Sequence, residues 1–249
     1  MKFPMAIFLK NSFSRTLLFA CSASLLFAAC APSRYVKPLT QGEHAVQVNV
    51  GGPMAKIPGI GAIPMPLTSV GYGYGLKNNL TLYGNLHTTS LLFGVGQLEL
   101  GAAWRCWKGE RAGVTLQPAL NSGVDLYTGA NRFWPQLDGN FYWDYREIRT
   151  KGKNGKGFHK TQSLYGGISQ WFDPYRTESQ GRKNEQFWIP SLQVGHLWER
   201  NRWVFQGELK ILAPIYSNQD IVVNYPSLLG NRGAMGLYFS ATYHLKNHE

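Results

Sequence analysis

Ser-Val-Gly-Tyr-Gly-Tyr-Gly-Leu-Lys-Asn-Asn-Leu-Thr-Leu-Tyr-Gly-Asn-Leu-His, residues 69–87, decides the fold of this 249-residue chain. Before the polar turn Lys77–Asn79, large apolar side chains alternate with glycines; after it, leucines alternate with small or polar side chains. A period of two with unlike faces is typical of β-strands, and three connecting residues predict an antiparallel hairpin. Membrane-spanning barrels repeat this unit around their wall.

The same alternation recurs along the chain. The sequence is 44% hydrophobic and 14% aromatic and holds 28 glycines. Outside the N-terminus no apolar run reaches the ~18 to 20 residues that a membrane helix needs, so any membrane crossing is expected to use strands. We predict an all-β, antiparallel up-and-down transmembrane β-barrel of about ten strands, with eight as the other possible count. The expected strands cover residues 43–50, 69–76, 80–87, 92–107, 114–121, 137–146, 163–172, 188–198, 203–211 and 235–245.

The connections between these strands alternate in length. An even number of strands places both chain ends on one side, and the shortest connections then become periplasmic turns: 77–79, 108–110 and 200–202. The long connections become extracellular loops, and they cover residues 51–66, 122–132, 173–185 and 217–232. The first of these is expected to hold no regular strand, because four of its residues are prolines. A short outer link at 88–91 and a flexible basic connection at 150–160 are exceptions.

The N-terminus is typical of a secretory signal, because basic residues precede the apolar run Thr16–Ala29. Leu26-Phe27-Ala28-Ala29-Cys30 resembles the lipobox of bacterial lipoproteins, which implies lipidation of Cys30; the alternative is an ordinary signal peptide cut near Ala29. The expected organisation is a signal peptide over 1–29, a lipid-anchored tether over 30–42 and a barrel domain over 43–249.

Charge and cysteine content narrow the environment. Removing residues 1–29 leaves 22 Lys and Arg against 14 Asp and Glu, a formal charge of +8. In an outer membrane this favours contact with anionic lipid and lipopolysaccharide, and an unidentified protein partner stays possible. No stacking aromatics accompany the basic run 151–156, so no nucleic-acid partner is predicted. No metal cluster or nucleotide fingerprint predicts a cofactor, and Cys106 is expected to have no disulfide partner.

Aromatic residues near the expected strand ends favour two interfacial girdles. The last strand resembles the C-terminal assembly signal of outer-membrane barrels, with Gly236 followed by alternating bulky residues, although the chain ends in Lys246-Asn247-His248-Glu249. Over residues 43–245 the chain is similar to small outer-membrane barrel proteins of Gram-negative bacteria, which implies location in the bacterial outer membrane. The aromatic residues are Trp104, Trp107, Trp134, Trp143, Tyr145, Trp188, Trp198, Trp203 and Tyr243.

A barrel of about ten strands has an interior largely filled by side chains. Inward charges of both signs most simply form ion pairs, whereas a narrow polar path would need gaps, which inward glycines such as Gly71, Gly73, Gly75 and Gly101 could supply. The expected inward charged residues are Glu99, Arg105, Asp138, Asp144, Arg146, Glu208 and Lys210.

Three functional hypotheses follow. The first is a non-catalytic outer-membrane barrel with a structural, binding or narrow-conduit role. The second is a rim enzyme of the lipid A acyl hydrolase or protease type, in which His87 would act with Ser90 or a carboxylate. The third is a soluble, lipid-tethered barrel that binds an apolar ligand inside, which requires the apolar faces to point inward. The pattern names no substrate, solute or oligomeric state.

Overall fold

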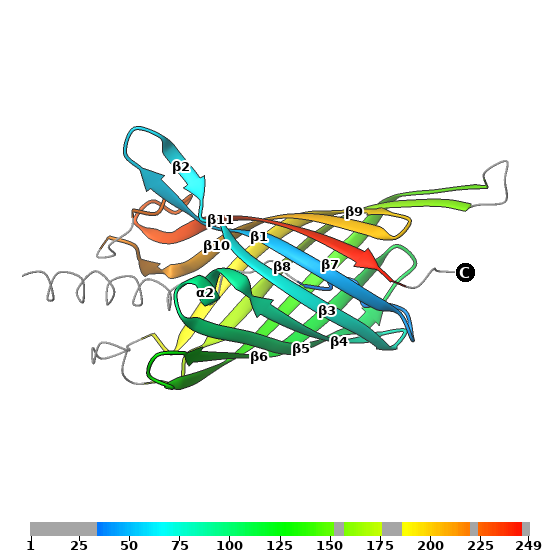
Figure 1. Ribbon diagram of the computed structural model, residues 1–249. Coiled ribbons are helices and arrows are strands. Elements are labelled where there is room, and N and C mark those ends of the chain that lie inside the picture. The colour runs from blue at the N-terminus through cyan, green and yellow to red at the C-terminus, as the bar shows by residue number, and fades with distance from the viewer. Residues whose placement is uncertain (1–33, 152–156, 176–185, 220–223, 246–249) are drawn as a thin grey trace, which may run out of the picture.

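The computed structural model describes residues 34–151, 157–175, 186–219 and 224–245, and these residues form a closed antiparallel β-barrel (Figure 1). Consecutive strands pair in chain order, and β1 (His44–Ile57) pairs with β11 (Arg232–His244) to close the wall. The predicted all-β up-and-down barrel of ten strands is therefore confirmed. The eight other wall strands are β3 (Leu67–Lys77), β4 (Leu80–His87), β5 (Val95–Lys108), β6 (Ala112–Asp125), β7 (Asn131–Lys151), β8 (Gly157–Phe172), β9 (Trp188–Arg200) and β10 (Trp203–Ser217).

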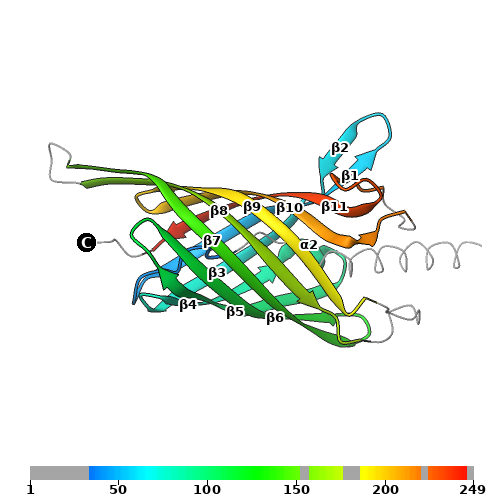
Figure 2. The same ribbon diagram turned by 180° about the vertical axis from the view of Figure 1, so that it is seen from behind.

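The two ends of the barrel differ. The end with the turns after β3, β5 and β9, where β1 begins and β11 stops, is called the turn end, and the opposite end is called the loop end. At the loop end a two-stranded ribbon projects from the wall (Figure 1). At the turn end β7 and β8 extend together beyond their neighbours (Figure 2).

The expectation that residues 51–66 hold no strand is wrong. β1 continues to Ile57 and pairs with β2 (Gly61–Pro64), which forms the projecting ribbon. Pro58 and Pro66 lie outside both strands. Pro53 lies where β1 leaves β11, and its carbonyl oxygen accepts a hydrogen bond from the Met65 amide. Pro64 is the last residue of β2 and lies opposite Met54 at the end of the β1–β2 ladder. The four prolines thus lie outside the strands or at the ends of their pairings.

Other predicted loops are shorter than expected. The link after β4 contains the short helix α2 (Thr88–Leu92), and the predicted loop 122–132 shrinks because β6 and β7 extend into it. In the basic connection 150–160, residues 150–151 and 157–160 are strand, because β7 and β8 remain paired out to Lys151 and Gly157. Among the described residues, no helix has the length and apolar character needed to cross a membrane.

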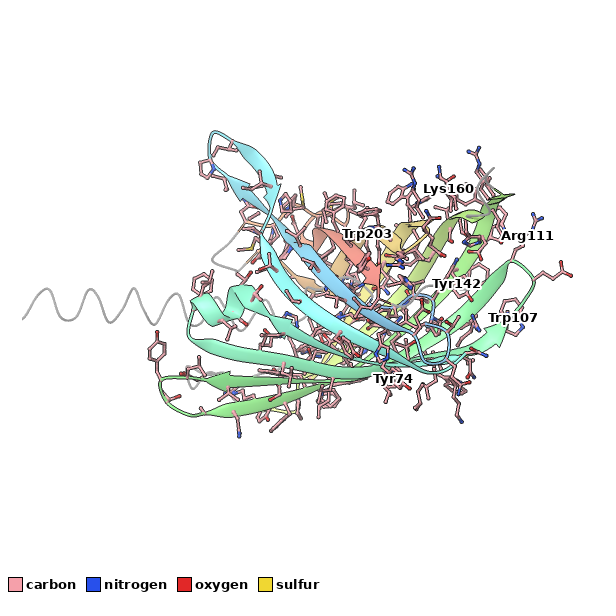
Figure 3. All side chains as sticks on the ribbon, turned by 45° about the vertical axis from the view of Figure 1, so that its right-hand side comes forward. Tyr74, Trp107, Arg111, Tyr142, Lys160 and Trp203 are labelled. Atoms are coloured by element: carbon pink, nitrogen blue, oxygen red, sulfur yellow. The ribbon has the colours of Figure 1, made fainter. Side chains whose placement is uncertain are left out.

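The two faces of the wall have opposite character. Side chains standing outward, such as Val70, Leu100 and Phe141, are large, apolar and roughly half exposed. Side chains facing the interior are mostly buried amides, hydroxyls and charges. Figure 3 shows both sets on the tilted strands, with Tyr142 turned inward. The third hypothesis required the inverse arrangement, so its apolar cavity is contradicted.

The opening hairpin has the predicted orientation. Tyr72 pairs with Gly84 and Gly73 with Tyr83, so the glycines of β3 and the polar face of β4 share the interior. Two single-residue predictions are wrong. A bulge at Tyr145 moves Arg146 to the exposed outer side, because the pairing shifts between Asp144–Ser163 and Arg146–Gln162. Trp134 is buried inside against Trp171, where it cannot belong to a girdle.

Candidate functional site in the barrel lumen

The residues before β1 enter the lumen from the turn end. This N-terminal segment, Arg34–Gly42, was predicted to be a tether, but Arg34, Tyr35, Val36 and Leu39 are all buried inside the barrel. Figure 1 shows this dark-blue start of the described chain between the strands. The lumen is therefore occupied by the protein's own chain.

A compact cap fixes the segment at the turn end. The Glu43 carboxylate accepts hydrogen bonds from the Thr40 amide at 2.8 Å and the Thr40 hydroxyl at 2.9 Å, and it also contacts His244. The Gly42 amide donates to the Gly75 carbonyl at 2.8 Å. Burial alone would raise the pKa of Glu43, but the hydrogen bonds from His244 and Thr40 outweigh it and lower that pKa below its ordinary value.

Wall side chains satisfy the backbone of the segment deeper inside. The Leu39 amide donates to Thr81 Oγ1 at 2.7 Å, and Thr115 Oγ1 donates to the Val36 carbonyl at 2.8 Å. Gln117 Nε2 donates to the Tyr35 carbonyl at 3.1 Å. Buried backbone groups require such partners, so these wall residues hold the segment without adding it to the strand ladder.

The apolar side chains of the segment pack against opposite walls. Tyr35 and Leu39 join a buried cluster that includes Tyr83 from β4. Val36 packs with Tyr142 of β7, Tyr165 of β8 and Leu197 of β9. The segment therefore spans the interior instead of lying along one wall.

Two cations of the segment form ion pairs with the wall. Lys37 Nζ lies 2.6 Å from Asp144 Oδ1 and 2.6 Å from Glu199 Oε1. Arg34 pairs with Glu99, and both side chains are almost fully buried. Glu99 pairs with Asn85, two residue pairs from the last pair of the β4–β5 ladder at the loop end, which joins His87 and Gln97. Arg34 therefore lies toward the loop end.

Inward glycines make room for the segment. A Cβ on Gly75 would lie 1.9 Å from the Thr40 carbonyl oxygen, and a Cβ on Gly73 would lie 2.5 Å from the Tyr35 ring. The gaps that the sequence predicts are present as missing side chains. The N-terminal segment fills those at Gly73 and Gly75, Tyr83 fills that at Gly101, and the Asn85 amide fills that at Gly71.

Four other charged residues predicted to face inward contact wall strands or their turns. Glu208 lies 3.3 Å from Lys210 and accepts a hydrogen bond from Tyr165 at 2.7 Å. Asp138 accepts hydrogen bonds from Gln136. Arg105 lies at the turn end, where it donates to the Asn78 carbonyl at 2.8 Å. The predicted pairing is thus found for Glu99, Asp144, Glu208 and Lys210, but two of these four pair with the segment.

His87 faces the interior at the loop end. Its Nε2 lies 3.7 Å from Glu99 Oε2, and that carboxylate is paired with Arg34. The Ser90 hydroxyl donates to the His87 carbonyl oxygen at 2.7 Å, not to the imidazole. Among the described residues, no group of three or more His, Cys, Asp or Glu could hold a metal ion. Cys106 is exposed and unbonded to another cysteine.

Sequence reasoning missed Arg34, Tyr35, Lys37 and Glu199. The four alternating small residues on the inner face of β3 were the available signal, because a run of inward glycines leaves a groove that a folded interior must fill. Cys30 and the signal peptide lie outside the described residues.

No protein-family model and no curated protein sequence matches this chain. Among solved structures, it is similar to Ail, the attachment invasion locus protein of Yersinia pestis, at 10% identity over 83% of this chain and 100% of that chain, with a TM-score of 0.26. It is also similar to the outer membrane protein OprG from Pseudomonas aeruginosa, at 12% identity over 84% and 99% of the two chains, with a TM-score of 0.24. Likenesses at these scores carry nothing about function.

Proposed function

We propose that the protein is a non-catalytic β-barrel of the bacterial outer membrane whose lumen is closed by its own N-terminal segment. The observation that carries the proposal is the reversal of faces: half-exposed apolar side chains cover the outer wall, and buried polar side chains line the interior. A water-soluble barrel would place these sets the other way round, because apolar surface is driven out of water at roughly 25 cal/mol per Å².

The exposed aromatic residues support the same environment. Amphipathic rings are favoured at head-group depth, and the outer wall carries several of them near the turn end, including Trp203 against Tyr243 with ring centroids 4.8 Å apart. If the turn end lies in the periplasm, the short turns are periplasmic and the ribbon and α2 are extracellular. This is the asymmetry expected of such barrels. The exposed wall residues in the predicted girdles are Trp104, Trp107, Trp143, Tyr145, Trp188, Trp198 and Trp203.

Lipid and lipopolysaccharide are the partners that this placement implies. The mature charge of +8 from the sequence suits contact with anionic head groups and phosphates. An unidentified protein partner would meet the ribbon first, because β1 and β2 carry it beyond the rim of the wall (Figure 1).

The predicted lipid on Cys30 has a geometric consequence. Cys30 precedes Arg34 by four residues, which span at most ~14 Å. Arg34 pairs with Glu99, and the strand from Glu99 to Lys108 at the turn end rises ~30 Å, which is ~23 Å along the axis of a barrel whose strands tilt by ~40°. A lipid in the periplasmic leaflet would therefore require the segment to leave the lumen. Labelling of wild type but not of Cys30→Ser by a radiolabelled fatty acid would support lipidation and would count against a lumen closed by the segment in the labelled molecules. An unlabelled wild type would contradict lipidation.

The enzyme hypothesis lacks a favouring contact. The Ser90 hydroxyl is engaged by a backbone carbonyl, and the carboxylate near His87 is engaged by Arg34. A nucleophile–base–acid relay needs these groups to face one another. We therefore propose the non-catalytic role.

Measurements of membrane embedding and of conductance test the proposal. Folded outer-membrane barrels migrate differently on gels before and after boiling, so heat-modifiable migration with protease protection in intact outer membranes is expected. Release of a water-soluble protein after removal of its lipid would contradict membrane embedding. In planar bilayers the wild type is expected to show little or no conductance; large steady channels would contradict a closed lumen.

A further inference from the structure

We propose that the lumen contains a binding site for a small guanidinium or ammonium solute, at the position that Arg34 occupies. The proposal rests on the barrel being membrane-embedded, and it names the class of solute that the lumen accepts. The site is a row of inward side chains, called the Glu99 row, that runs across neighbouring strands. Strand pairing aligns Gln47 with Gly71, Gly71 with Asn85, Asn85 with Glu99 and Glu99 with Asn121.

The Glu99 row is completely enclosed and rich in acceptors. Gln47, Asn85, Glu99 and Asn121 are each at most 1% exposed. The amide oxygens of Gln47, Asn85 and Asn121 are buried and accept no hydrogen bond from the described residues. Asn85 and Asn121 pair with Glu99 from its two neighbouring strands, and Gln47 lies two strands beyond Asn85. The row therefore offers amide oxygens on both sides of the Glu99 carboxylate, and a cation with several N–H donors is the chemical group that suits such acceptors.

The amide nitrogens of the row are already committed. Asn85 Nδ2 donates to Glu99 at 3.4 Å, and Asn121 Nδ2 donates to Gln136 Oε1 at 3.1 Å. Gln47 Nε2 donates to Thr242 Oγ1 at 3.0 Å. These bonds fix the amide orientations, so the oxygens are the atoms left for a solute.

The charge of the inner wall favours a cation over an anion. Glu99, Asp138 and Glu208 are buried with Lys210, and Asp144 and Glu199 add two carboxylates nearer the turn end. Asp138 and Glu208 also lie within electrostatic range of Arg34. Of the basic side chains at the two ends, Arg105 donates to the Asn78 carbonyl and Arg132 lies over the Tyr175 ring.

The N-terminal segment occupies the lumen where a cationic solute would bind. It presents one cation to the Asp144–Glu199 pair and a second to Glu99, two positions that a cation entering from the turn end would meet in succession. The described bonds between its backbone and the wall strands come mainly from side chains, so its withdrawal leaves the wall ladder complete. Withdrawal removes two positive charges and leaves the carboxylates available.

Charge reversal of the segment tests the proposal. Arg34→Glu with Lys37→Glu gives the segment two negative charges, which Glu99, Asp144 and Glu199 repel. Arg34→Lys with Lys37→Arg keeps both positive charges and is the control. In planar bilayers the reversed variant is expected to open channels whose reversal potential in a KCl gradient lies toward that of K⁺. Guanidinium chloride and spermidine are expected to block them, and the conservative variant is expected to stay closed.

Three further substitutions test whether the row is the site. Adding Glu99→Gln to the open variant is expected to weaken guanidinium block by at least tenfold, whereas adding Glu147→Gln, which removes an exposed acid that pairs with His159, leaves it unchanged. Gly75→Ala is a second open design: its Cβ is expected to expel the segment by steric clash, and it keeps every charge. Heat-modifiable protein that stays closed in both open designs, or that conducts anions or resists guanidinium, overturns the proposal. A wild type without heat-modifiable migration contradicts membrane embedding instead.

Discussion

Arg34 and Glu99 lie 65 residues apart in the sequence and form an ion pair inside the barrel, with side chains only 2% and 1% exposed. The pair joins the N-terminal segment to β5. The segment, whose sequence resembles a tether, is therefore part of the barrel interior.

Breaking this pair from one side is expected to be costly. Arg34→Ala leaves a buried carboxylate without its cation, and the free energy of unfolding is expected to fall by about 3 kcal/mol. Adding Glu99→Gln is expected to recover much of that loss, because the charge is then removed as well. Urea titration of protein refolded in phospholipid vesicles measures both, and additive single and double effects would contradict the pairing.

Adding one methyl group to β3 is expected to displace the segment. The Cβ of Gly75→Ala would lie 1.9 Å from the Thr40 carbonyl oxygen, a backbone atom that cannot turn aside. Amides of residues 34–42 are expected to exchange hydrogen faster by mass spectrometry, with the wall strands unchanged. Gly207→Ala is the matched control, because its Cβ would meet a Trp198 ring carbon at an ordinary 3.5 Å. Equal exchange in both variants would argue against a seated segment.

Acid is expected to release the cap at the turn end. Because the pKa of Glu43 is lowered in the folded protein, its ionised form stabilises the cap above the ordinary value of 4.5, and this stabilisation is lost as the pH falls through the lowered value. Exchange of the Thr40 and Gly42 amides, corrected for intrinsic rates, is therefore expected to accelerate as the pH falls below 4.5. Glu43→Gln is expected to remove that pH dependence, and an unchanged profile in this variant would assign it to another group.

An arginine on the outer wall is expected to be penalised only in a bilayer. Leu100 is 57% exposed in the middle of β5, and Leu100→Arg is expected to cost about 2–4 kcal/mol in vesicles. Ile60 is 71% exposed at the tip of the ribbon, and Ile60→Arg is expected to change the unfolding free energy by less than about 0.5 kcal/mol. Similar small effects at both positions would contradict a lipid-facing wall.

The wall of the barrel is predictable from sequence because every strand has unlike faces. A period of two places Tyr72 outward and Gly73 inward regardless of tertiary detail. Arg146 escapes this rule, because a single bulged residue at Tyr145 reverses the faces beyond it, and the alternation does not mark the bulge. The strands of the β1–β2 ribbon were not predicted, because prolines were expected to exclude them. Each strand of a two-stranded ribbon has one edge without a partner, and prolines are tolerated there.

The site is less predictable than the wall. Glu99, Asp144, Glu208 and Lys210 are found inside as expected, but the partners of two of them come from a stretch with no periodicity. Pairing over 65 residues depends on which loops and segments enter the lumen, and local pattern does not specify that. The inward glycines of β3 indicated a space to fill, but not what fills it.

The location of the N-terminal segment in the membrane-embedded protein is the central claim, and a cross-link tests it most directly. The Leu39 amide lies 2.7 Å from Thr81 Oγ1, so Leu39→Cys with Thr81→Cys, in a chain carrying Cys106→Ser, is expected to form a disulfide on mild oxidation of intact outer membranes. The account predicts near-complete cross-linking of the heat-modifiable form. A heat-modifiable barrel in which these two cysteines stay reduced would show that the segment lies outside the lumen.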